Sequence, residues 1–424
     1  MIEKVSLFKN KRDFFHLFIL IFVLFSLSIS YEFYNYKELT KFDSQLCDGI
    51  VLKQYPKTKL TKSGKTKTYQ VLKIQSDNGF KFYTTTQSST PDIKYKHIKL
   101  EIWAGNISFY EYIHGFYSFS KILQIHSNKS YKKRLNIFVD AQHQDKNASL
   151  IYQALFSAKQ LPLELQTSFS ILGISHLIAI SGFHLGVLTT ILFFLLKYPY
   201  LFIQSRYFPY RSLRRDTFVI LLVFLLSYLL FLDSPPSLLR AFIMLIIGFV
   251  LYDRGIKIIS MQTLLLSSLL ILALFPRLMF SIGLFLSLAG VFYIYLFLIY
   301  AKNLSKVWQS VLLPIWVYLM MLPFSLSIFG NFSLYHPLSI IYSVLFTLFY
   351  PLSMLLHLLG IGDILDPLLH YLLSIRTAPV KLEFPSYLLT IIISLSLLSI
   401  YKKYFIYFLV LFNLSLLAYS FSTI

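Results

Sequence analysis

The chain has 424 residues, 56% of them apolar and only 14% charged, which excludes a soluble globular protein because such proteins carry about 25% charged residues. The formal net charge of +20 favours an anionic partner such as nucleic acid, anionic lipid or a charged solute, unless the extra Lys and Arg serve membrane topology alone. Cys47 is the only cysteine, so an intramolecular disulfide and a cysteine-based metal cluster are excluded.

Residues 1–30 combine a basic flank, MIEKVSLFKNKR, with the apolar run FFHLFILIFVLFSLSIS. A basic flank before about 17 apolar residues is typical of a signal peptide or of an uncleaved membrane anchor. Ser28 and Ser30 resemble only a weak cleavage site, so the anchor is favoured. We expect a cytoplasmic flank that is followed by this anchor.

Residues 31–134 lack long apolar runs and contain short strand-like segments. The stretch IKLEIW, from Ile98 to Trp103, alternates apolar and charged residues as a half-buried strand does. The turn signal Asp77-Asn78-Gly79 separates VLKI from FKF and predicts a hairpin. About five such segments predict a small β-barrel or sandwich. The region holds 18 Lys and Arg against 8 Asp and Glu, a net charge of +10 that exceeds what membrane topology requires.

Residues 135–170 have apolar positions at helical spacing, which predicts an amphipathic segment on the membrane surface. The rest of the chain is hydrophobic. Predicted membrane spans cover 171–196, 217–232, 237–253, 257–275, 278–300, 307–329, 384–401 and 404–422. The region 336–361 is too long for one simple span, and Pro337 and Pro351 interrupt it.

Basic residues between the spans predict the orientation of the chain. They are Arg206, Arg211, Arg214 and Arg215, then Arg254 with Lys257, and then Lys302 with Lys306. Because cytoplasmic loops are rich in Lys and Arg, these loops and the N-terminus are predicted to be cytoplasmic, and the β domain is predicted to lie outside. Lys402 and Lys403 fit the cytoplasm only if 336–361 turns back on itself as a re-entrant pair.

The stretch HLIAISGFHLG, from His176 to Gly186, places polar side chains inside a predicted span. A polar side chain in hydrocarbon is costly unless it is paired or hydrated. On one continuous helix, His176 and His184 would lie about 80° apart with Ser181 between them, so they could face a watery cavity. The alternative is that they bond a neighbouring helix. Gly182 and Gly186 would permit close backbone approach or a local break.

The stretch DSPPSLLRAF places Asp233 and Arg240 seven residues apart, nearly on one helical face. The two prolines between them predict that the helix begins near Ser237. Arg240 then lies about one turn into a span, either as a phosphate contact through its planar fork or as an ordinary interfacial anchor. In FSLSIFGNFSLYHPL, Gly330 and Asn331 predict an outer turn, with Phe332 among the interfacial aromatic residues.

These segments carry a resemblance to a known family. HLIAISGFHLG resembles the HLLAISGLHVG signature of the ComEC family of competence proteins, the inner-membrane DNA-uptake channels. SLLRAFIML resembles the family's arginine–alanine helix, and LFPRLMFSIGLFLSLAGVF resembles its proline-containing span with Gly283 and Ser287. LPFSLSIFGNFSLYHPLS resembles a further family segment. Phe285 and Ile340 stand where the family usually has Gln and Asn, so the chain departs from the family's polar pattern at these two positions.

The resemblance implies a polytopic α-helical membrane protein with about 9–10 transmembrane segments and a small, OB-like extracytoplasmic β domain. The expected parts are the flank and anchor (1–30), the β domain (31–134), the amphipathic segment (135–170), the competence-type core (171–361) and a C-terminal portion with an interfacial segment and the last helices (362–424). A metallo-β-lactamase-like domain is expected to be absent, because no His-x-His-x-Asp-His run occurs in the sequence.

The implied function is transport of single-stranded DNA across the inner membrane during natural transformation. The residues expected to line the DNA path are His176, Ser181, Gly182, His184, Asp233 and Arg240. No catalytic residue, metal or cofactor is expected. The expected partners are single-stranded DNA, membrane lipid, a cytoplasmic translocation motor, outer DNA receptors and further copies of the chain. The alternative is a secondary transporter of a small anion, although no internal duplication supports it; an intramembrane hydrolase lacks its sequence motifs.

Overall fold

The computed structural model describes residues 11–60, 66–94, 96–126, 131–375, 380–382 and 384–423. The chain divides into two compact units. The β module comprises 10–131 and 269–281, and the helical unit comprises 132–268 and 282–424 together with 1–9. The basic flank predicted at the N-terminus lies almost wholly outside the described residues.

The β module begins with a long helix, α1 (Lys11–Leu39), which extends well past the predicted anchor. Leu39 belongs to the hydrophobic core of the module, and the Tyr36 hydroxyl donates to the Ile107 carbonyl oxygen at 2.9 Å. The helix continues past residue 30 because its aromatic side chains pack on the module; the rings of Tyr36 and Phe109 lie 5.4 Å apart. The first strand therefore begins at Gln45, not near residue 31.

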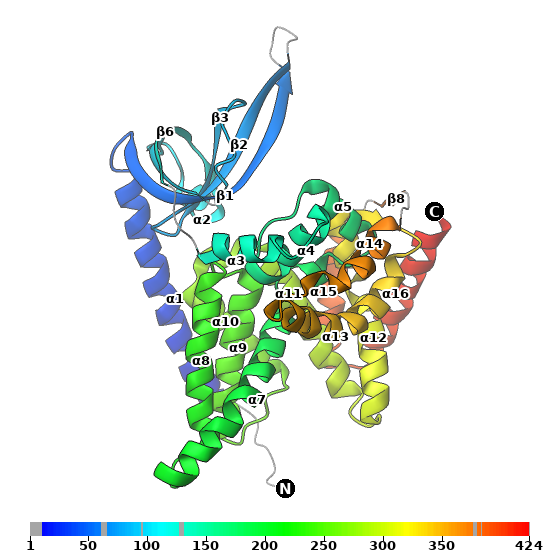
Figure 1. Ribbon diagram of the computed structural model, residues 1–424. Coiled ribbons are helices and arrows are strands. Elements are labelled where there is room, and N and C mark those ends of the chain that lie inside the picture. The colour runs from blue at the N-terminus through cyan, green and yellow to red at the C-terminus, as the bar shows by residue number, and fades with distance from the viewer. Residues whose placement is uncertain are drawn as a thin grey trace. The chain divides into compact units, whose positions relative to one another are not determined.

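Six strands and one short helix follow α1 in the β module (Figure 1). They are β1 (Gln45–Leu60), β2 (Thr66–Ser76), β3 (Lys81–Gln87), β4 (His97–Trp103), α2 (Phe109–His114), β5 (Phe116–Tyr117) and β6 (Phe119–His126). The sheet order is β5-β3-β2-β1-β4-β6, with β5 parallel to β3 and the other pairs antiparallel. Since only one residue separates β5 from β6, the two edges of the sheet meet, as in the partly open barrel of an OB fold.

Two sequence predictions for this region, the strand at IKLEIW and the hairpin at Asp77-Asn78-Gly79, agree with the structure. IKLEIW forms β4, and its alternate residues Ile98, Leu100 and Ile102 are buried. VLKI and FKF lie in the paired strands β2 and β3. Gly79 in the connecting turn has a φ of +84°, a backbone conformation that glycine adopts without steric cost.

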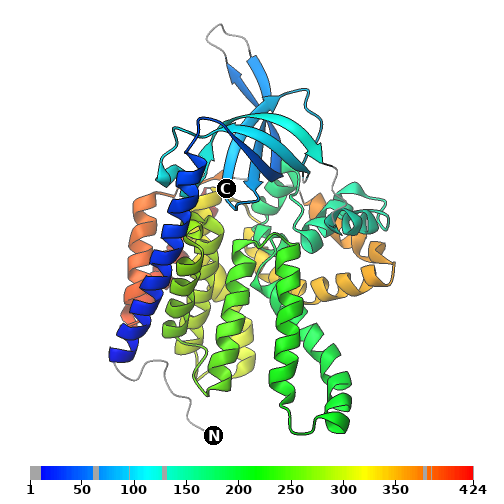
Figure 2. The same ribbon diagram turned by 90° about the vertical axis from the view of Figure 1, so that its left-hand side faces the viewer.

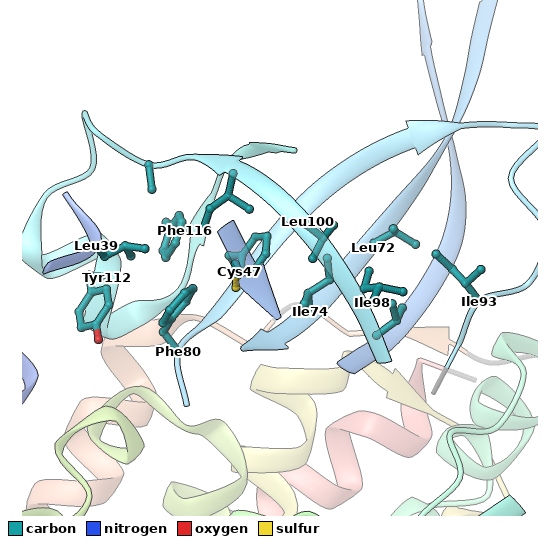
Figure 3. Packing of buried hydrophobic residues seen from close by; sticks show 14 residues of the cluster. Leu39, Cys47, Leu72, Ile74, Phe80, Ile93, Ile98, Leu100, Tyr112 and Phe116 are labelled. Atoms are coloured by element: carbon teal, nitrogen blue, oxygen red, sulfur yellow. The ribbon is translucent and has the colours of Figure 1, made fainter. Parts of the chain in front are cut away.

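The inward-facing side chains form one core that includes residues from the strands and from both helices (Figure 3). The rings of Phe82 and Phe116 stack at 5.7 Å, and those of Phe80 and Phe116 at 5.9 Å. Each fully buried Leu, Ile or Phe side chain stabilises the fold by about 1.5–3 kcal/mol relative to an exposed one. The core therefore joins the edge strand β5 and its neighbour β3 to the end of α1.

Cys47 supplies a test of how firmly this core is closed. Burial raises the pKa of its thiol to about 11, although Ser76 Oγ lies 3.3 Å from the sulfur and lowers it. At pH 8 the thiol is therefore protonated, and only the thiolate is nucleophilic. We expect iodoacetamide to modify the folded protein in detergent at least tenfold more slowly than the urea-unfolded protein. Mass spectrometry measures this directly because the chain has one cysteine; equal rates would contradict a closed core.

The helical unit contains the remaining elements apart from the end of α10 and η1, which belong to the β module. The first are α3 (Tyr131–Asp140), α4 (Lys146–Ser157), α5 (Leu163–Ile171), α6 (Ser175–Ile178), α7 (Gly182–Tyr207), α8 (Leu213–Phe231), α9 (Pro236–Asp253), α10 (Met261–Leu274) and η1 (Pro276–Phe280). They are followed by α11 (Ile282–Tyr300), α12 (Lys306–Phe329), β7 (Asn331–Phe332), η2 (His336–Leu338), α13 (Ser339–Leu358) and η3 (Gly362–Leu365). The last are α14 (Asp366–Ser374), β8 (Val380–Lys381), α15 (Ser386–Leu398) and α16 (Tyr404–Ser422).

Seven helices in the described part of the chain are long and apolar enough to cross a membrane. They are α1, α7, α9, α11, α12, the segment formed by η2 and α13, and α16. Helices α10 and α15 are apolar but shorter, and α8 carries Arg214, Arg215 and Asp216 in its first turn. The predicted fold class is confirmed: the protein is a multi-pass helical membrane protein with an N-terminal β domain.

The predicted surface helix in 135–170 is instead a set of separate helices. Helix α4 buries Ile151, Tyr152 and Leu155, which share one core with residues of α13 and α14. The apolar face that suggested contact with lipid headgroups is therefore covered by protein. The spacing of apolar residues predicts helices here, and helices are present. Spacing does not, however, identify what covers the apolar face of a helix.

A re-entrant pair in 336–361, the condition under which Lys402 and Lys403 were expected to fit the cytoplasm, is not present in the structure. The region holds the short η2 and one helix, α13, with Pro351 inside it. Figures 1 and 2 show α13 lying across the direction of α7, α8 and α9. Proline removes one backbone hydrogen bond but does not end this helix, as is common in membrane proteins where neighbouring groups compensate.

Because α13 lies crosswise, the loop between α15 and α16 lies on the same side of the helical unit as the other basic loops. Arg215 forms an ion pair with Asp253 at 3.1 Å, so the start of α8, next to the α7–α8 loop, meets the end of α9. The Tyr300 hydroxyl donates to the Ser399 carbonyl oxygen at 2.7 Å, so the α15–α16 loop with its Lys403 meets the end of α11. Figure 2 shows the α7–α8, α9–α10 and α11–α12 loops at one end of the helical unit. The loop that contains Lys403 therefore joins the other basic loops without a re-entrant turn.

Candidate functional site

The stretch HLIAISGFHLG is not one helix, contrary to the prediction. His176 lies in α6, His184 lies in α7, and Ala179 and Ser181 between them have extended backbone conformations. Ser181 is the N-cap of α7, and its Oγ accepts a hydrogen bond from the Phe183 N–H at 3.3 Å. A serine hydroxyl that satisfies the free N–H groups of a helix start favours a new helix at that point. The polar residues of the motif thus make a break within an apolar segment.

His184 completes the cap of α7. The Ser181 N–H donates to His184 Nδ1 at 3.1 Å, so Nδ1 carries no hydrogen and Nε2 carries the hydrogen of the neutral ring. The side chain is 0% exposed, and its ring centroid lies 4.4 Å from that of Tyr350 and 5.6 Å from that of Phe346. His184 is therefore enclosed in packing, and its predicted place on the wall of a path is wrong. Its Nε2 has no hydrogen-bond partner among the described residues.

Gly182 is the point at which α7 meets α9. A Cβ at this position would lie 3.0 Å from Ala241 Cβ and 3.2 Å from Arg240 Nη2, closer than ordinary contact. The Ser237 hydroxyl also donates to the Ile180 carbonyl oxygen at 2.8 Å. The predicted close approach is therefore present at Gly182. It is absent at Gly186, where no heavy atom lies within 4 Å of an added Cβ.

Arg240 is buried beside this contact, with 6% of its surface exposed. Its Nε donates to Ser287 Oγ of α11 at 2.7 Å, and Nη1 lies 3.0 Å from Met244 Sδ. No carboxylate in the described part of the chain forms an ion pair with it. The predicted alternative of an interfacial anchor is wrong, because the guanidinium does not reach solvent.

Two helix starts meet at the guanidinium. Helix α7 begins at Gly182 and α9 begins at Pro236, one turn before Arg240. The N-terminus of a helix carries roughly half a positive charge, and its first N–H groups point outward from the helix. A buried positive charge beside two such ends makes this junction electropositive. The junction can hold an anion, and phosphate oxygens suit both the N–H groups and the planar fork of arginine.

Two of the predicted site residues bind elsewhere. The exposed His176 has Nδ1 3.1 Å from the Gly173 carbonyl oxygen and Nε2 3.2 Å from Ser343 Oγ. Asp233 has a φ of +60°, precedes α9, and forms an ion pair with Lys132. Asp233 therefore lies before α9, as the two prolines predict, and shares no helical face with Arg240. Ser181, Gly182, His184 and Arg240 form one contiguous junction in the structure.

Sequence reasoning missed two of the partners at this junction. Ser237 was noted only as a helix start, and Ser287 only as part of a small-residue pattern. A buried arginine in a span requires polar partners. That requirement, applied to the polar residues of nearby predicted spans, would have singled out Ser287. Phe332, predicted to be interfacial, is fully buried and stacks on His336 at 5.2 Å.

The β module carries a second candidate surface, the aromatic face of Tyr83, Trp103, Tyr117 and Phe119. Tyr83 and Tyr117 are neighbours on β3 and β5, and Trp103 and Phe119 are neighbours on β4 and β6. The Tyr117 and Phe119 rings lie 5.6 Å apart, and Phe119 is 70% exposed. Lys73 Nζ lies 5.1 Å from the Tyr83 ring centroid. Exposed rings beside lysines can stack bases and attract phosphates.

Neither surface has the arrangement of a catalytic centre. Across the residues that the structure describes, no three His, Cys, Asp or Glu side chains are grouped so that they could hold a metal ion. The polar groups of the junction are a capping serine, a neutral histidine and an arginine. Groups of this kind can hold an anion by charge and hydrogen bonding.

Comparison with known proteins identifies the family. The family model described as Competence protein matches residues 156–421, which is well over half of the chain. Neither the curated proteins nor the solved structures that were compared with the chain gave a match. The matched region contains the α6–α7 break, Arg240 and Ser287, and the segments that resemble ComEC proteins. The chain therefore belongs to the Competence protein family, the ComEC-type membrane proteins of DNA uptake.

Proposed function

We propose that this protein carries single-stranded DNA across the inner membrane during natural transformation, and that the junction at Arg240 is a phosphate contact on the path. The observation that carries this proposal is a buried arginine without an ionic partner among the described residues, placed at two helix starts. An intramembrane charge of this kind costs about 2.5–3.5 kcal/mol by insertion scales, so a functional role is the default inference. DNA supplies the missing negative charge.

The break between α6 and α7 supports a path whose wall is formed by the polypeptide backbone and not by a row of exposed side chains. Ser181 and Gly182 are half-buried, while His184 holds the turn from inside. Broken helices whose starts point at an anion occur at the transport sites of membrane transporters. The path-lining roles of Ser181, Gly182 and Arg240 are retained in this proposal. His184 becomes a positioning residue for the turn.

The β module supports the same function through its aromatic face and its charge. Bases of any sequence stack on aromatic rings, and each such stack contributes about 1–3 kcal/mol. The net charge of +10 in residues 31–134 attracts the phosphate backbone and releases counterions. The β module is therefore proposed to gather single-stranded DNA before it enters the helical unit.

Membrane sidedness is proposed from the basic residues. The four basic loops of the helical unit, one of them holding Arg215 and another Lys403, are assigned to the cytoplasm by the positive-inside rule. The basic residues before α1 place the N-terminus on that side too, so the β module lies outside the inner membrane. DNA then meets the β module first and the cytoplasm last.

Other proteins are proposed to do the remaining work. Since neither described surface has a nucleophile or metal centre, degradation of the second strand is assigned to a separate nuclease. A cytoplasmic motor draws the strand, outer receptors deliver it, and membrane lipid surrounds the spans; a homo-oligomer is compatible with this scheme. The alternative, a transporter of a small anion, is compatible with the Arg240 junction but assigns no role to the aromatic face.

The aromatic face gives the test that separates these functions. The full-length protein in lipid nanodiscs should bind a fluorescent single-stranded oligonucleotide, and its affinity should fall steeply as salt rises. The double variant Tyr117→Ala/Phe119→Ala should lose at least tenfold in affinity, because two stacks at about 1–3 kcal/mol each are removed. Phe42→Ala is the control, since Phe42 is exposed in the β module but does not belong to the aromatic face. An anion transporter would show no affinity for the oligonucleotide at low salt.

A further inference from the structure

Three buried titratable side chains form a hydrogen-bonded row in the helical unit, outside the junction at Arg240. His143 follows α3, His357 lies in the last turn of α13, and Asp366 begins α14. His143 Nδ1 lies 2.9 Å from Asp366 Oδ2, and His143 Nε2 lies 2.9 Å from His357 Nε2. His357 Nδ1 lies 2.7 Å from the Ser353 carbonyl oxygen. The His143 side chain is 0% exposed and that of Asp366 is 12% exposed.

The hydrogens of this row can be counted. The Ser353 carbonyl oxygen only accepts, so His357 Nδ1 carries a hydrogen and His357 Nε2 is an acceptor when that ring is neutral. The Asp366 carboxylate also accepts, so His143 Nδ1 carries a hydrogen. With two neutral rings, two lone pairs would face each other at 2.9 Å. One additional proton removes this conflict, because His143 Nε2–H then donates to His357 Nε2. The same count holds if that proton lies on Asp366.

In the described part of the chain, no other buried side chain beside the row carries the positive charge that the additional proton brings. Tyr152 stacks on His143 at a centroid distance of 4.7 Å; its burial raises the pKa of its phenol, as does the charge of Asp366, so the phenol stays neutral. Among the other titratable groups on the adjoining elements, Asp140, Lys146, Asp363 and His370 are exposed, Asp145 is half-buried, and Tyr350 of α13 is buried. Two of these groups contact each other: His370 Nε2 lies 3.5 Å from Asp145 Oδ2.

We propose that Asp366, His143 and His357 form a clasp that closes only while it holds one shared proton, and that this clasp fixes the end of α13 to the α3–α4 loop. A neutral contact supports the same joint, because Gln142 bonds both the His357 carbonyl oxygen and the Gly362 N–H. Loss of the proton leaves one negative charge and two opposed lone pairs in a buried place.

The clasp bears on the junction because α13 contacts the HLIAISGFHLG stretch nearer its other end. Ser343 Oγ lies 3.2 Å from His176 Nε2, and the Tyr350 ring packs on His184 at 4.4 Å. His357 lies on the same helix, seven residues after Tyr350. Opening the clasp therefore releases the C-terminal end of α13, whose earlier turns pack on the break between α6 and α7. This makes the break sensitive to proton concentration through α13.

The direction of the pH dependence follows from the proton count. The ordinary pKa of a histidine side chain is about 6.5. Above this pH the open form holds no additional proton, whereas the closed form holds one. The closed form is therefore favoured less as pH rises, by about tenfold per pH unit until it releases its proton.

Hydrogen exchange of the full-length protein in detergent tests the clasp without DNA. Labelling times are scaled for the base-catalysed rate, and peptides covering 353–366 are compared at pH 6.5, 7.5 and 8.5. The wild-type protein should lose about tenfold in protection between pH 7.5 and 8.5. His143→Phe keeps a ring against Tyr152 but cannot hold the proton, so its protection should be low and independent of pH. His370→Gln removes the exposed His–Asp contact between the same elements and should behave as the wild type.

Several results would overturn the clasp. Constant wild-type protection across this pH range would show that no proton holds the joint, and this measurement needs no variant. A pH dependence that persists in His143→Phe, or that disappears in His370→Gln, would assign it to other groups. If EDTA alone opens the segment at pH 6.5, a bound metal ion holds the two rings and the proposal is wrong.

Discussion

Replacing Arg240 by methionine is expected to reduce entry of DNA into the cytoplasm by about 10–150-fold, the loss expected when a charged hydrogen-bonding contact worth about 1.5–3 kcal/mol is removed. The amount of protein in the membrane should hold or rise. Insertion of an arginine into a span costs about 2.5–3.5 kcal/mol, and methionine removes that cost while retaining an unbranched side chain. The two readouts therefore move in opposite directions.

The measurement combines transformation frequency, uptake of labelled DNA and immunoblotting of membranes in a strain that carries the variant gene. Labelled DNA should still reach the cell surface and accumulate there, since the aromatic face of the β module is unchanged. Arg240→Lys should be intermediate, because it keeps the charge and loses the planar fork. Arg254→Gln is the control for a change of one charge, since Arg254 is exposed just after the same helix.

Full DNA entry by an abundant Arg240→Met protein would remove the phosphate contact from the proposed function. A fall in DNA entry that matches a fall in abundance would assign Arg240 to the fold instead. Ser287→Ala provides a further check, because it removes the hydroxyl that accepts from Arg240 Nε but leaves the charge in place. It should reduce DNA entry less than Arg240→Met does.

Two alanine substitutions in the same motif are expected to behave in opposite ways. Gly182→Ala places a Cβ 3.0 Å from Ala241 Cβ and 3.2 Å from Arg240 Nη2, so α7 and α9 must separate. Overpacking of this kind costs about 1–3 kcal/mol, and here it displaces the guanidinium. Gly186→Ala adds a methyl group in open space within a helix, which stabilises the helix by up to about 1 kcal/mol.

Thermal unfolding of the two variants in detergent measures the difference, and uptake of labelled DNA measures its consequence. Gly182→Ala should melt below the wild type and lose at least tenfold in DNA entry, whereas Gly186→Ala should melt at or above the wild type and retain uptake. The double variant Gly182→Ala/Ala241→Gly should recover stability, because it removes the atom that the new Cβ meets. Equal behaviour of the two single variants would contradict the close approach of α7 and α9.

Local signals in the sequence were sufficient for much of the fold. Asn78-Gly79 between alternating strands predicted the β2–β3 hairpin, and the alternation of IKLEIW predicted β4 with its inward face. Long apolar runs predicted α7 to α12, α15 and α16. In each of these segments, the residues that decide the structure are neighbours in the sequence.

The remaining features depend on contacts between distant residues. Ser181 is the right residue type for a helix start, but in an apolar run its cap competes with a continuous helix, and α9 against Gly182 favours the break. Arg240 and Ser287 are 47 positions apart, and His143 and His357 are 214 apart. Hydrophobicity also cannot distinguish a helix that crosses the membrane from one that lies across its neighbours, which is why the sequence leaves the path of α13 open.

The unbroken passage of α1 into the β module has a mechanical consequence. Leu39 is buried among the strands while residues 12–39 form a single candidate span, so five residues, 40–44, separate that helix from β1. Under the proposed function, a motor that pulls on a strand held by the aromatic face would load this joint. The force would pass through packed rings and a continuous helix into the bilayer rather than into a flexible linker. The helix would thus hold the module in place while DNA is drawn away from it.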